Sequence, residues 1–497
     1  MELFDIIIIG AGVIGNAVAR ELSRKNYTLA VLDKEADAGF GISSRNSGVV
    51  HSGIHYTPGS NRAILNIAGN AAMESLCRDL SVPFIRTGKL TIAASQEEQA
   101  ALHELKEQGE ANGVPGMEMM DSATMDQLQP GIAGTEGLYT PSTGIVNPMA
   151  LTIALAEHAH LHGVSYRFLH KVIRITQVQD SRFQIESETP QGRSALETRM
   201  IINCAGMHAD TIAKLCGYHQ HTIYPCRGEY YVLDKRLDQS LNLLIYPVPG
   251  THSSGLGIHL TKTVEGNILI GPSNEYIADR MDCSTTSEIM EMLKSEGKTL
   301  LPTLVTSDFI RSFSGLRPKL TPPDVGGFDD FVIRYQPACD SVIHVLGIES
   351  PGLTAAPAIG KKVAEMAHHI LPVSEKPWRP DFPDIPGIYR RPYPASMYSL
   401  DERKALVDQD PDFGSIICRC EEISLAEVRS ALKRMFGPLT YAGIKNRCRP
   451  MSGRCQGGFC MPRIAHILNG EWGIPHENHM LKGPDSVLYT GLLRDGE

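Results

Sequence analysis

Residues 4–33 read FDIIIIGAGVIGNAVARELSRKNYTLAVLD, and this stretch decides the fold of the first part of the chain. The apolar, β-branched run Phe4–Ile9 predicts a buried strand, and apolar residues at helical spacing over Ile14–Lys25 predict a helix. Residues Thr28–Leu32 return to strand character. Strand, turn, helix and strand in this order predict a βαβ unit in a parallel sheet.

The turn of this unit carries the glycine pattern of a dinucleotide-binding site. Gly10 would turn the chain, Gly12 would let the backbone approach a pyrophosphate, and Gly15 would permit close helix packing. The helix N-terminus attracts phosphate groups, and Asp33 ends the next strand, where its carboxylate would accept hydrogen bonds from a ribose hydroxyl. An ordinary glycine-rich turn is the alternative. The pattern by itself does not separate FAD from NAD.

Length and composition predict several soluble domains. The chain has 497 residues, of which 42% are hydrophobic and 21% charged, as in ordinary globular proteins. Asp and Glu number 56 against 47 Lys and Arg, and the formal charge of -9 provides no basic field for nucleic acid or anionic lipid. Small molecules and proteins are therefore the expected partners.

The chain shows no signal for a membrane or for secretion. No apolar run approaches the roughly 20 residues that span a bilayer, and the sequence enters a strand directly, which predicts a cytoplasmic protein without a membrane span. Five of the 11 cysteines fall between Cys418 and Cys460. Clustered cysteines without a secretion signal indicate a metal site rather than a disulfide framework.

Further strands and a proline-rich stretch suggest how the domains are arranged. Met200–Cys204 predicts a strand that leads into Ala205-Gly206, and Tyr230–Leu233 and Asn267–Ile270 suit a separate antiparallel layer. Prolines crowd residues 371–412, which lack helical periodicity and are expected to form a linker or surface strap. Beyond it, Ser424–Glu427 has a capping-box pattern that opens a helix ending at Gly437-Pro438.

At this point the sequence resembles the D-amino-acid-oxidase-like flavoproteins, and within them most closely the L-2-hydroxyglutarate dehydrogenases. The likeness covers about residues 4–370 and rests on Ser43–Gly48 (SSRNSG), Asn46–Ile54 (NSGVVHSGI), Thr87–Leu90 (TGKL), Asn112–Gly116 (NGVPG), Thr143–Val146 (TGIV), Asn203–Gly206 (NCAG), Arg227–Tyr230 (RGEY), Ile245–Pro249 (IYPVP) and Leu256–His259 (LGIH). That family commonly has Glu where this chain has Asp33, and both residues supply a carboxylate.

The resemblance implies FAD as the cofactor and assigns a set of residues to it. The implied FAD-binding residues are Gly10, Gly12, Ile14, Gly15, Asp33, Lys34, Arg45, Asn46, Ser47, Gly48, Val172, Ala205, Gly206, Gly352 and Leu353. In such proteins a helix like the one expected over Thr354–Ile370 points its N-terminus at the flavin ring, where its partial positive charge stabilises the reduced flavin's anion. A glycine-punctuated turn between strand and helix is the alternative.

The expected architecture is an α/β fold. A Rossmann-like FAD-binding domain takes residues of about 1–90, 145–225 and 325–370, with an inserted antiparallel β-rich substrate domain formed by about 90–145 and 225–325. These parts form an FAD-dependent oxidoreductase over 1–370. A Pro-rich linker (371–412), a small α-helical iron-sulfur domain (413–475) and a tail (476–497) follow.

The last domain carries four cysteines whose spacing suits an iron-sulfur cluster. One residue separates Cys418 from Cys420 and four separate Cys455 from Cys460, unlike zinc ribbons, in which two residues separate paired cysteines. Here the chain resembles the bacterioferritin-associated-ferredoxin-like domain, including Gly453–Gly457 and Phe459-Cys460, which implies a [2Fe-2S] cluster on these four ligands. Zinc or an empty site is the alternative. Pro450–Ser452 departs from that family's usual Ala-Gly-Met, and Cys448 is not assigned as a ligand.

Oxidation of a 2-hydroxy acid on a flavin needs a cation for the carboxylate and a base for the hydroxyl proton. Arg227 and Arg317 are the candidate cations, each with a structural ion pair as its alternative, and Lys319 is a weaker one. His51 or His259 is the candidate base, although most histidines in a chain have structural roles. Tyr246 would add a hydrogen bond to the substrate.

Two resemblances suggest different substrates. The catalytic part favours an L-2-hydroxy acid such as 2-hydroxyglutarate, whereas an appended iron-sulfur domain resembles the large subunit of anaerobic glycerol-3-phosphate dehydrogenases. Both reactions oxidise a small anionic secondary alcohol by hydride transfer to flavin N5, and the cluster implies an electron-accepting partner protein or subunit. A non-catalytic electron-transfer subunit and an amine-oxidising enzyme are the alternatives.

Overall fold

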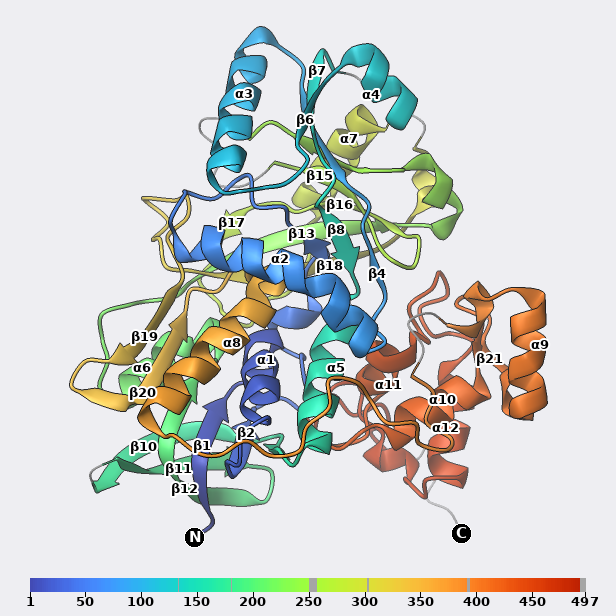
Figure 1. Cartoon of the computed structure of the whole chain (residues 1–497). Helices are drawn as coiled ribbons and strands as arrows, with labels where there is room; N and C mark the ends of the chain where they lie inside the picture. Colours follow the sequence, from blue (N-terminus) through green and yellow to red (C-terminus); the bar gives the residue numbers. More distant parts are fainter. Residues whose placement is uncertain (133, 180, 250–256, 302–303, 391–393, 492–497) are drawn as a thin grey trace.

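The computed structural model describes residues 1–132, 134–179, 181–249, 257–301, 304–390 and 394–491. Leu256 of the family-like segment, Pro392 of the expected linker and residues 492–497 of the expected tail lie outside the described residues. Two sheets stacked along the long axis of the molecule form the main body, and a helical C-terminal module lies beside it (Figure 1).

The first sheet is built on the predicted βαβ unit. Strand β1 pairs in parallel with β2 on one side and β12 on the other, and β12 pairs in parallel with β20. The sheet order is β10-β11-β12-β1-β2-β9, with β20 and then β19 attached to β12. The strands are β1 (Leu3–Ile9), β2 (Leu29–Leu32), β9 (Ser165–Arg167), β10 (Lys171–Gln179), β11 (Arg182–Thr189), β12 (Gly192–Asn203), β19 (Val332–Gln336) and β20 (Cys339–Leu346).

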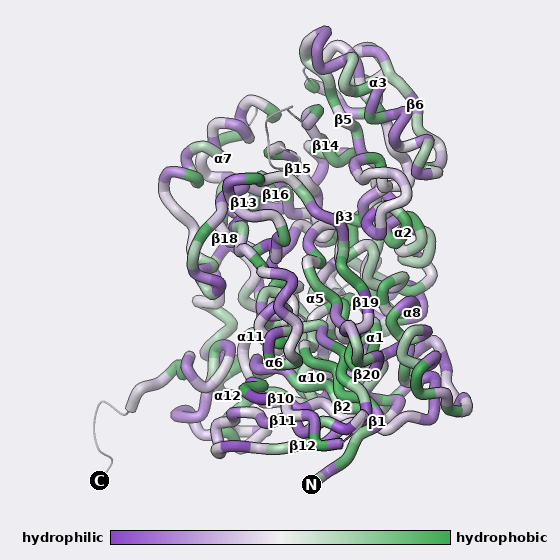
Figure 2. The backbone as a smooth tube through the Cα atoms, turned by 90° about the vertical axis from the view of Figure 1, so that its left-hand side faces the viewer, coloured by the Kyte–Doolittle hydropathy of each residue, from purple (hydrophilic) through white to green (hydrophobic). Residues whose placement is uncertain are grey.

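Alternate residues of β1 bury both faces of this sheet. Ile6 and Ile8 pack into the core beneath α1 (Val13–Leu22), α5 (Pro148–Leu161) and α8 (Gly352–Ile370). Ile7 and Ile9 belong to a second core on the other face, under α6 (Ala209–Leu215). A strand turns successive side chains to opposite faces, so a run of four isoleucines suits a strand covered on both sides. Figure 2 shows these central segments as the hydrophobic part of the tube.

Helix α1 ends earlier than the sequence predicted. It stops at Leu22 rather than Lys25. The N–H groups of Arg24 and Lys25 donate to the carbonyls of Glu21 and Leu22, three residues back, and this tighter turn directs the chain into β2.

The second sheet contains both of the predicted β-rich segments, which lie next to each other. In β13 and β16, Tyr231 pairs with Ile270 and Val232 with Leu269, antiparallel. The expectation of an antiparallel layer is wrong at one place, since β14 and β5 pair in parallel. The strands are β5 (Lys89–Ala93), β6 (Glu118–Asp121), β7 (Glu136–Thr140), β13 (Tyr224–Leu233), β14 (Leu244–Pro247), β15 (His259–Lys262), β16 (Ile268–Gly271), β17 (Glu275–Tyr276) and β18 (Phe309–Lys319).

Further elements cover and join the two sheets. Helices α3 (Gln96–Ala111), α4 (Ser122–Leu128) and α7 (Ser287–Leu300) pack on the second sheet, whereas α2 (Asn61–Asp79) packs along α8. A small sheet of β3 (Val49–Val50), β8 (Gly144–Val146) and β4 (Phe84–Ile85) lies between the two large ones.

The C-terminal module has its own core of helices around a two-stranded sheet. Its elements are α9 (Leu400–Gln409), β21 (Ile416–Cys418), β22 (Ile423–Ser424), α10 (Leu425–Lys433), α11 (Tyr441–Cys448) and α12 (Met461–Gly470). The predicted capping box at Ser424 and Glu427 is present with both of its hydrogen bonds. Residues 476–491, expected as a tail, pack back on the module, where the buried His479 contacts the Tyr441 hydroxyl at 3.1 Å.

Two predictions for this region are wrong. Helix α10 ends at Lys433 rather than at Gly437-Pro438, because Phe436 turns back to stack on His160 of the main body. The expected linker is not free of helix, since α9 occupies residues 400–409 and begins with a capping box of Ser399 and Glu402. The preceding part does lie on the surface as a strap, with Trp378 stacked against Arg24.

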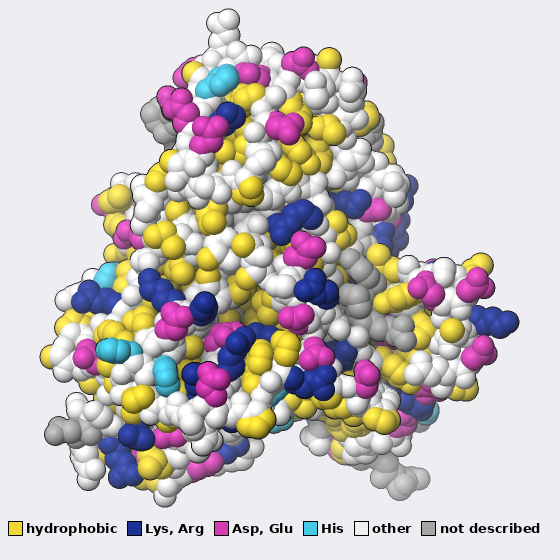
Figure 3. Space-filling model, viewed as in Figure 1, with side chains coloured by type: hydrophobic (Ala, Val, Ile, Leu, Met, Phe, Trp, Pro, Cys, Tyr) yellow, Lys and Arg dark blue, Asp and Glu magenta, His cyan; other side chains and the backbone are white. Residues whose placement is uncertain are grey.

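No helix among the described residues combines the length and apolar character that crossing a bilayer requires. Side chains of both charges are interspersed over the face of the molecule drawn in Figure 3.

Candidate functional site

A cavity of about 740 Å³ lies between the two large sheets. Its lower wall comes from the start of α1, the loop after β2 and the start of α8, and its upper wall from β13, β15 and β18. Of the predicted cofactor and catalytic residues, the following line it: Gly12, Ile14, Arg45, Asn46, Ser47, His51, Gly206, Tyr246, His259, Arg317, Gly352 and Leu353.

Two helix N-termini open into this cavity. Neither α1 nor α8 has an N-cap side-chain hydrogen bond or an acidic residue in its first turn, and the positive dipole ends of both helices face the cavity. The Val13 N–H donates to Ser43 Oγ at 2.9 Å, and a Cβ on Gly12 would lie only 3.2 Å from that oxygen. This cradle fits a pyrophosphate at α1 and an electron-rich ring edge at α8, as FAD would require.

Gly10 and Gly15 support the cradle from outside the cavity. Gly10 has φ of +111°, a conformation that favours glycine, and a Cβ on Gly15 would lie 1.9 Å from the Gly10 carbonyl oxygen. Asp33 Oδ2 accepts a hydrogen bond from the Ala11 N–H at 2.6 Å, and burial raises the pKa of Asp33 to about 6. The carboxylate thus also shapes the glycine turn.

The remaining predicted cofactor residues do not line the cavity. Lys34 contacts His208 and Glu35, whereas Val172 lies near the start of β10. Gly48 and Ala205 flank lining residues without lining the cavity themselves. Their assignment to FAD continues to rest on the resemblance.

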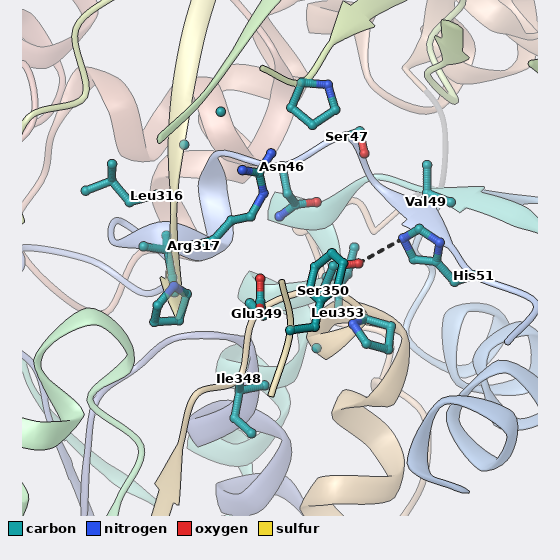
Figure 4. Close-up of a pocket in the computed structure, with 18 of the residues that line it drawn as sticks. Asn46, Ser47, Val49, His51, Leu316, Arg317, Ile348, Glu349, Ser350 and Leu353 are labelled. Atoms are coloured by element: carbon teal, nitrogen blue, oxygen red, sulfur yellow. Dashed lines mark hydrogen bonds between the residues drawn. The ribbon is translucent and has the colours of Figure 1, made fainter. Parts of the chain in front are cut away.

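His51 lines the cavity and is held there by the distant segment 350–354 at the start of α8. Its Nε2 lies 3.2 Å from Ser350 Oγ, and its backbone N–H donates to Thr354 Oγ1 at 3.0 Å (Figure 4). Burial, together with Lys89, His259 and Arg62, lowers the pKa of His51 to about 3. The imidazole is therefore neutral at ordinary pH, which leaves one ring nitrogen unprotonated.

His259 and Tyr246 form one wall as a stacked pair. Their ring centroids are 3.9 Å apart with planes at 15°, and His259 Nδ1 bonds to the Gly257 carbonyl at 2.9 Å. Burial lowers the pKa of His259 to about 3 and raises the pKa of the Tyr246 phenol. Because Nδ1 faces a carbonyl oxygen, His259 carries its hydrogen there, leaving Nε2 as an acceptor.

The structure separates the two candidate arginines. Arg317 lines the cavity and donates to Asn274 Oδ1 at 3.0 Å and to the Ser273 carbonyl at 2.8 Å, with no carboxylate in ion-pair contact among the described residues. Arg227 lies outside the lining and is enclosed by carboxylates at 2.7–3.3 Å, those of Glu229, Glu275 and Asp282. Arg317 keeps its charge available for a ligand, whereas Arg227 has the structural ion-pair role.

A buried carboxylate beside the site is compensated by two cations. Glu349 lines the cavity, with its Oε1 3.6 Å from Arg62 and its Oε2 3.4 Å from Lys319 (Figure 4). Lys319, the weaker candidate cation, also donates to the Gly327 carbonyl at 2.6 Å and lies outside the lining. It is thus a structural partner of Glu349.

Sequence reasoning missed several residues of the cavity wall, chief among them His55. Its Nε2 lies 3.0 Å from Nζ of Lys89, a lysine with only 1% of its surface exposed. Lys89 lies in one of the family-like segments, and His55 directly follows another. The signal that could have revealed the pair was a charged residue, Lys89, in the otherwise uncharged strand Lys89–Ala93.

The four predicted cluster ligands meet in the C-terminal module as two pairs. The thiols of Cys418 and Cys460 share a hydrogen bond, as do those of Cys420 and Cys455, and the Met451 N–H bonds to the first pair. Among the described residues, no three His, Cys, Asp or Glu side chains are placed around a single metal ion. Two thiol pairs suit a two-iron cluster, in which each iron takes two protein ligands.

Ion pairs, most of them buried, fix this module against the main body. Arg447, whose side chain is fully buried, pairs with Asp37 and with Glu157 of α5, and Arg390 and Arg434 also contact Glu157. On the second sheet's side, Arg449 pairs with Glu265 and Arg454 with Asp234. Both layers of the main body therefore set the position of the module.

Comparison with known proteins agrees with this architecture. Residues 5–366 match the model of the FAD dependent oxidoreductase family, and residues 416–470 match that of the BFD-like [2Fe-2S] binding domain. A glycerol 3-phosphate dehydrogenase of Caloramator mitchellensis is 37% identical over 98% of both chains. An L-2-hydroxyglutarate dehydrogenase of Indibacter alkaliphilus is 30% identical over 73% of this chain and 98% of its own.

Solved structures share the fold of the main body. The FAD-bound L-alpha-glycerophosphate oxidase from Mycoplasma pneumoniae superposes with a TM-score of 0.71 at 28% identity, covering 78% of this chain and all of its own. The chain belongs to the FAD dependent oxidoreductase family, as a dehydrogenase of the glycerol-3-phosphate and 2-hydroxyglutarate kind with a C-terminal BFD-like [2Fe-2S] binding domain.

Proposed function

We propose that the protein oxidises a small anionic secondary alcohol in the cavity between its two sheets and passes the electrons on through its C-terminal module. One observation carries this proposal: Arg317, a cation without a carboxylate partner among the described residues, lines the same cavity as the neutral base His51 (Figure 4).

Each side chain has a defined task in this proposal. Arg317 holds the anionic group through its planar guanidinium, which suits a carboxylate or phosphate. His51 accepts the proton of the hydroxyl group, while Ser350 orients its ring. Bound FAD supplies the two-electron acceptor that the protein's own side chains lack. The stacked rings of Tyr246 and His259 form an apolar wall against bulk water.

Two substrates are candidates. Glycerol 3-phosphate comes first, because the relative with that name matches along both the oxidoreductase part and the cluster module. L-2-hydroxyglutarate comes second, because its dehydrogenases match the catalytic part. The family-like sequence segments alone had favoured L-2-hydroxyglutarate over glycerol 3-phosphate.

We also propose that electrons leave along α11 to a partner protein. Burial, and the like charges of Arg311, Arg45 and Arg449, lower the pKa of Lys445 on this helix to about 8, so α11 lies within electrostatic range of the cavity residue Arg45. Cys448 ends the same helix, before the loop that leads to Cys455.

Anaerobic mixing of the FAD-loaded protein with a substrate panel tests the function. Glycerol 3-phosphate or L-2-hydroxyglutarate should bleach the flavin absorbance within the mixing experiment, whereas amino acids and uncharged alcohols should not. Bleaching by amino acids alone would show an amine oxidase. Reduction by dithionite but by no small molecule would show an electron-transfer subunit.

A further inference from the structure

Lys89 is a buried amine on the floor of the site. It begins β5, has 1% of its surface exposed, and contacts His55 Nε2 through Nζ at 3.0 Å. The same Nζ lies 4.9 Å from the centroid of the Tyr246 ring. His55 and Tyr246 both line the cavity, so Lys89 lies directly behind its wall.

The surroundings of Lys89 contain bases and cations rather than acids. His51, His55 and His259 lie within electrostatic range of Lys89. The positive charge of Arg62, on α2, also lowers the pKa of His51. Burial, with no carboxylate contributing, lowers the pKa of Lys89 to about 7. Among the described residues no carboxylate forms an ion pair with it. A buried charge of this kind needs a counter-ion, and the accessible place for one is the cavity.

While Lys89 is protonated, its hydrogen bond also determines which nitrogen of His55 carries a hydrogen. A protonated lysine can only donate, so Nε2 of His55 must accept and its Nδ1 must carry the hydrogen. His55 is then a hydrogen-bond donor on the cavity wall, with a positive charge behind it. This is the arrangement that binds an anion.

We propose that His55, positioned and polarised by Lys89, binds the second negative charge of a dianionic substrate whose first charge Arg317 holds. The inference rests on the proposed oxidation of an anionic alcohol and narrows its substrate class to dianions. A dicarboxylate would place one carboxylate against each of the two residues, and a phosphate monoester would place oxygens of its one doubly charged phosphate against both; a neutral or monoanionic alcohol lacks the second charge.

Unreactive analogues test this subsite by binding alone. Calorimetry on the FAD-loaded protein compares glutarate with its monoamide, and propyl phosphate with its methyl diester, so that each pair differs by one charge. The wild type should prefer the dianion of at least one pair by about 10- to 100-fold. The pair that shows the preference identifies the second charge as a carboxylate or as a phosphate.

Lys89→Met should reduce that preference to less than about threefold while monoanion binding stays unchanged. Methionine matches the lysine's length without its charge, and such buried replacements are generally tolerated. His55→Phe should have the same effect and provides an independent variant if Lys89→Met does not fold. Lys106→Met on the surface of α3, which removes a lysine paired with Glu110, is the control and should keep the wild-type preference.

The pH dependence distinguishes this role from a merely structural one. Because Lys89 loses its proton near pH 7, dianion affinity in the wild type should fall as pH rises above that value, by up to about tenfold per pH unit. Lys89→Met should lack this dependence.

A dianion preference that survives in both variants, or its absence from the wild type, would overturn the subsite. The outcome is separable from the proposed function. If a substrate reduces the flavin but Lys89→Met keeps the wild-type preference for dianions, only the subsite is refuted. A Lys89-dependent preference without any flavin reduction refutes only the oxidation.

Discussion

His51 Nε2 lies 3.2 Å from Ser350 Oγ, although the two residues are 299 positions apart in the chain. The contact joins the segment after β3 to the turn that starts α8. It brings the candidate base and the helix end that would face a flavin to one point, so the site exists only when the first and last parts of the oxidoreductase domain are assembled.

Replacing His51 should slow flavin reduction without loss of the cofactor. His51→Asn removes the proton acceptor and should lower the rate of anaerobic flavin reduction by about 10²- to 10⁴-fold, the usual contribution of a general base. Because the pKa of His51 is about 3, the wild-type rate should not fall through protonation of this residue between pH 5 and 8. Stopped-flow absorbance measures both. A rate that stays within threefold of wild type would exclude His51 as the base.

Gly12→Val should give a folded protein that does not retain FAD. The added side chain would project toward Ser43 Oγ, 3.2 Å from a Cβ, and fill the space above the first turn of α1. Gly15→Ala serves as the contrast: its Cβ would collide with the Gly10 carbonyl at 1.9 Å, so it should lower the melting temperature as well. Flavin absorbance after desalting, with circular dichroism, tells the two effects apart. Normal yellow colour in Gly12→Val would contradict the assigned cradle.

Cys455→Ala should abolish the iron-sulfur cluster and leave flavin reduction by substrate intact. Iron analysis and electron paramagnetic resonance of the reduced protein measure the cluster, and electron delivery to an external acceptor should fall with it. Cys448→Ala is the matched control, because the Cys448 thiol contacts the Ile444 carbonyl within its own helix at 3.5 Å and is not a proposed ligand. Loss of iron from the control would reassign the ligand set.

Glu157→Gln should weaken the attachment of the C-terminal module. Three arginines of that module and its strap surround this buried carboxylate, and removing one partner from a buried ion-pair group costs about 3–5 kcal/mol. Urea unfolding should show this loss of free energy of unfolding. Limited proteolysis should cleave the strap of the variant faster than that of the wild type. Glu110→Gln, from an exposed pair on α3, should change stability by less than about 0.5 kcal/mol.

Lys89→Met should stabilise the protein, and more so at lower pH. The folded state holds the pKa of Lys89 near 7, below the ordinary 10.5, so the penalty for its buried charge is complete below pH 7 and declines as pH rises toward 10.5. The decline amounts to about 1.4 kcal/mol per pH unit in that window. Thermal unfolding at pH 6.5 and 9.5, without ligand, measures the difference. If Lys89→Met stabilised the protein equally at pH 6.5 and pH 9.5, Lys89 would not have the lowered pKa described here.

Local patterns in the sequence were sufficient for the βαβ unit, the capping box at Ser424 and the cofactor motifs. The alternating burial of Ile6 to Ile9 follows from a β-branched run, and the glycine turn follows from residues that need close backbone approach. The capping box of Ser424 was predictable because both of its hydrogen bonds lie within four residues. The equivalent signal at Ser399 was present too, but the surrounding prolines concealed it.

What only the tertiary structure decided is which charges remain free. Arg227 and Arg317 look alike as sequence, yet one is enclosed by three carboxylates, two of them from other segments, and the other faces the cavity. Lys89 likewise becomes a site residue only through His55. By itself, the sequence predicted the βαβ unit, the FAD and [2Fe-2S] cofactors and four candidate cluster cysteines, because the signals for them lie in short motifs. The pairing of charges depends on residues far apart in the chain, and electrostatic partners are set by folding rather than by local spacing.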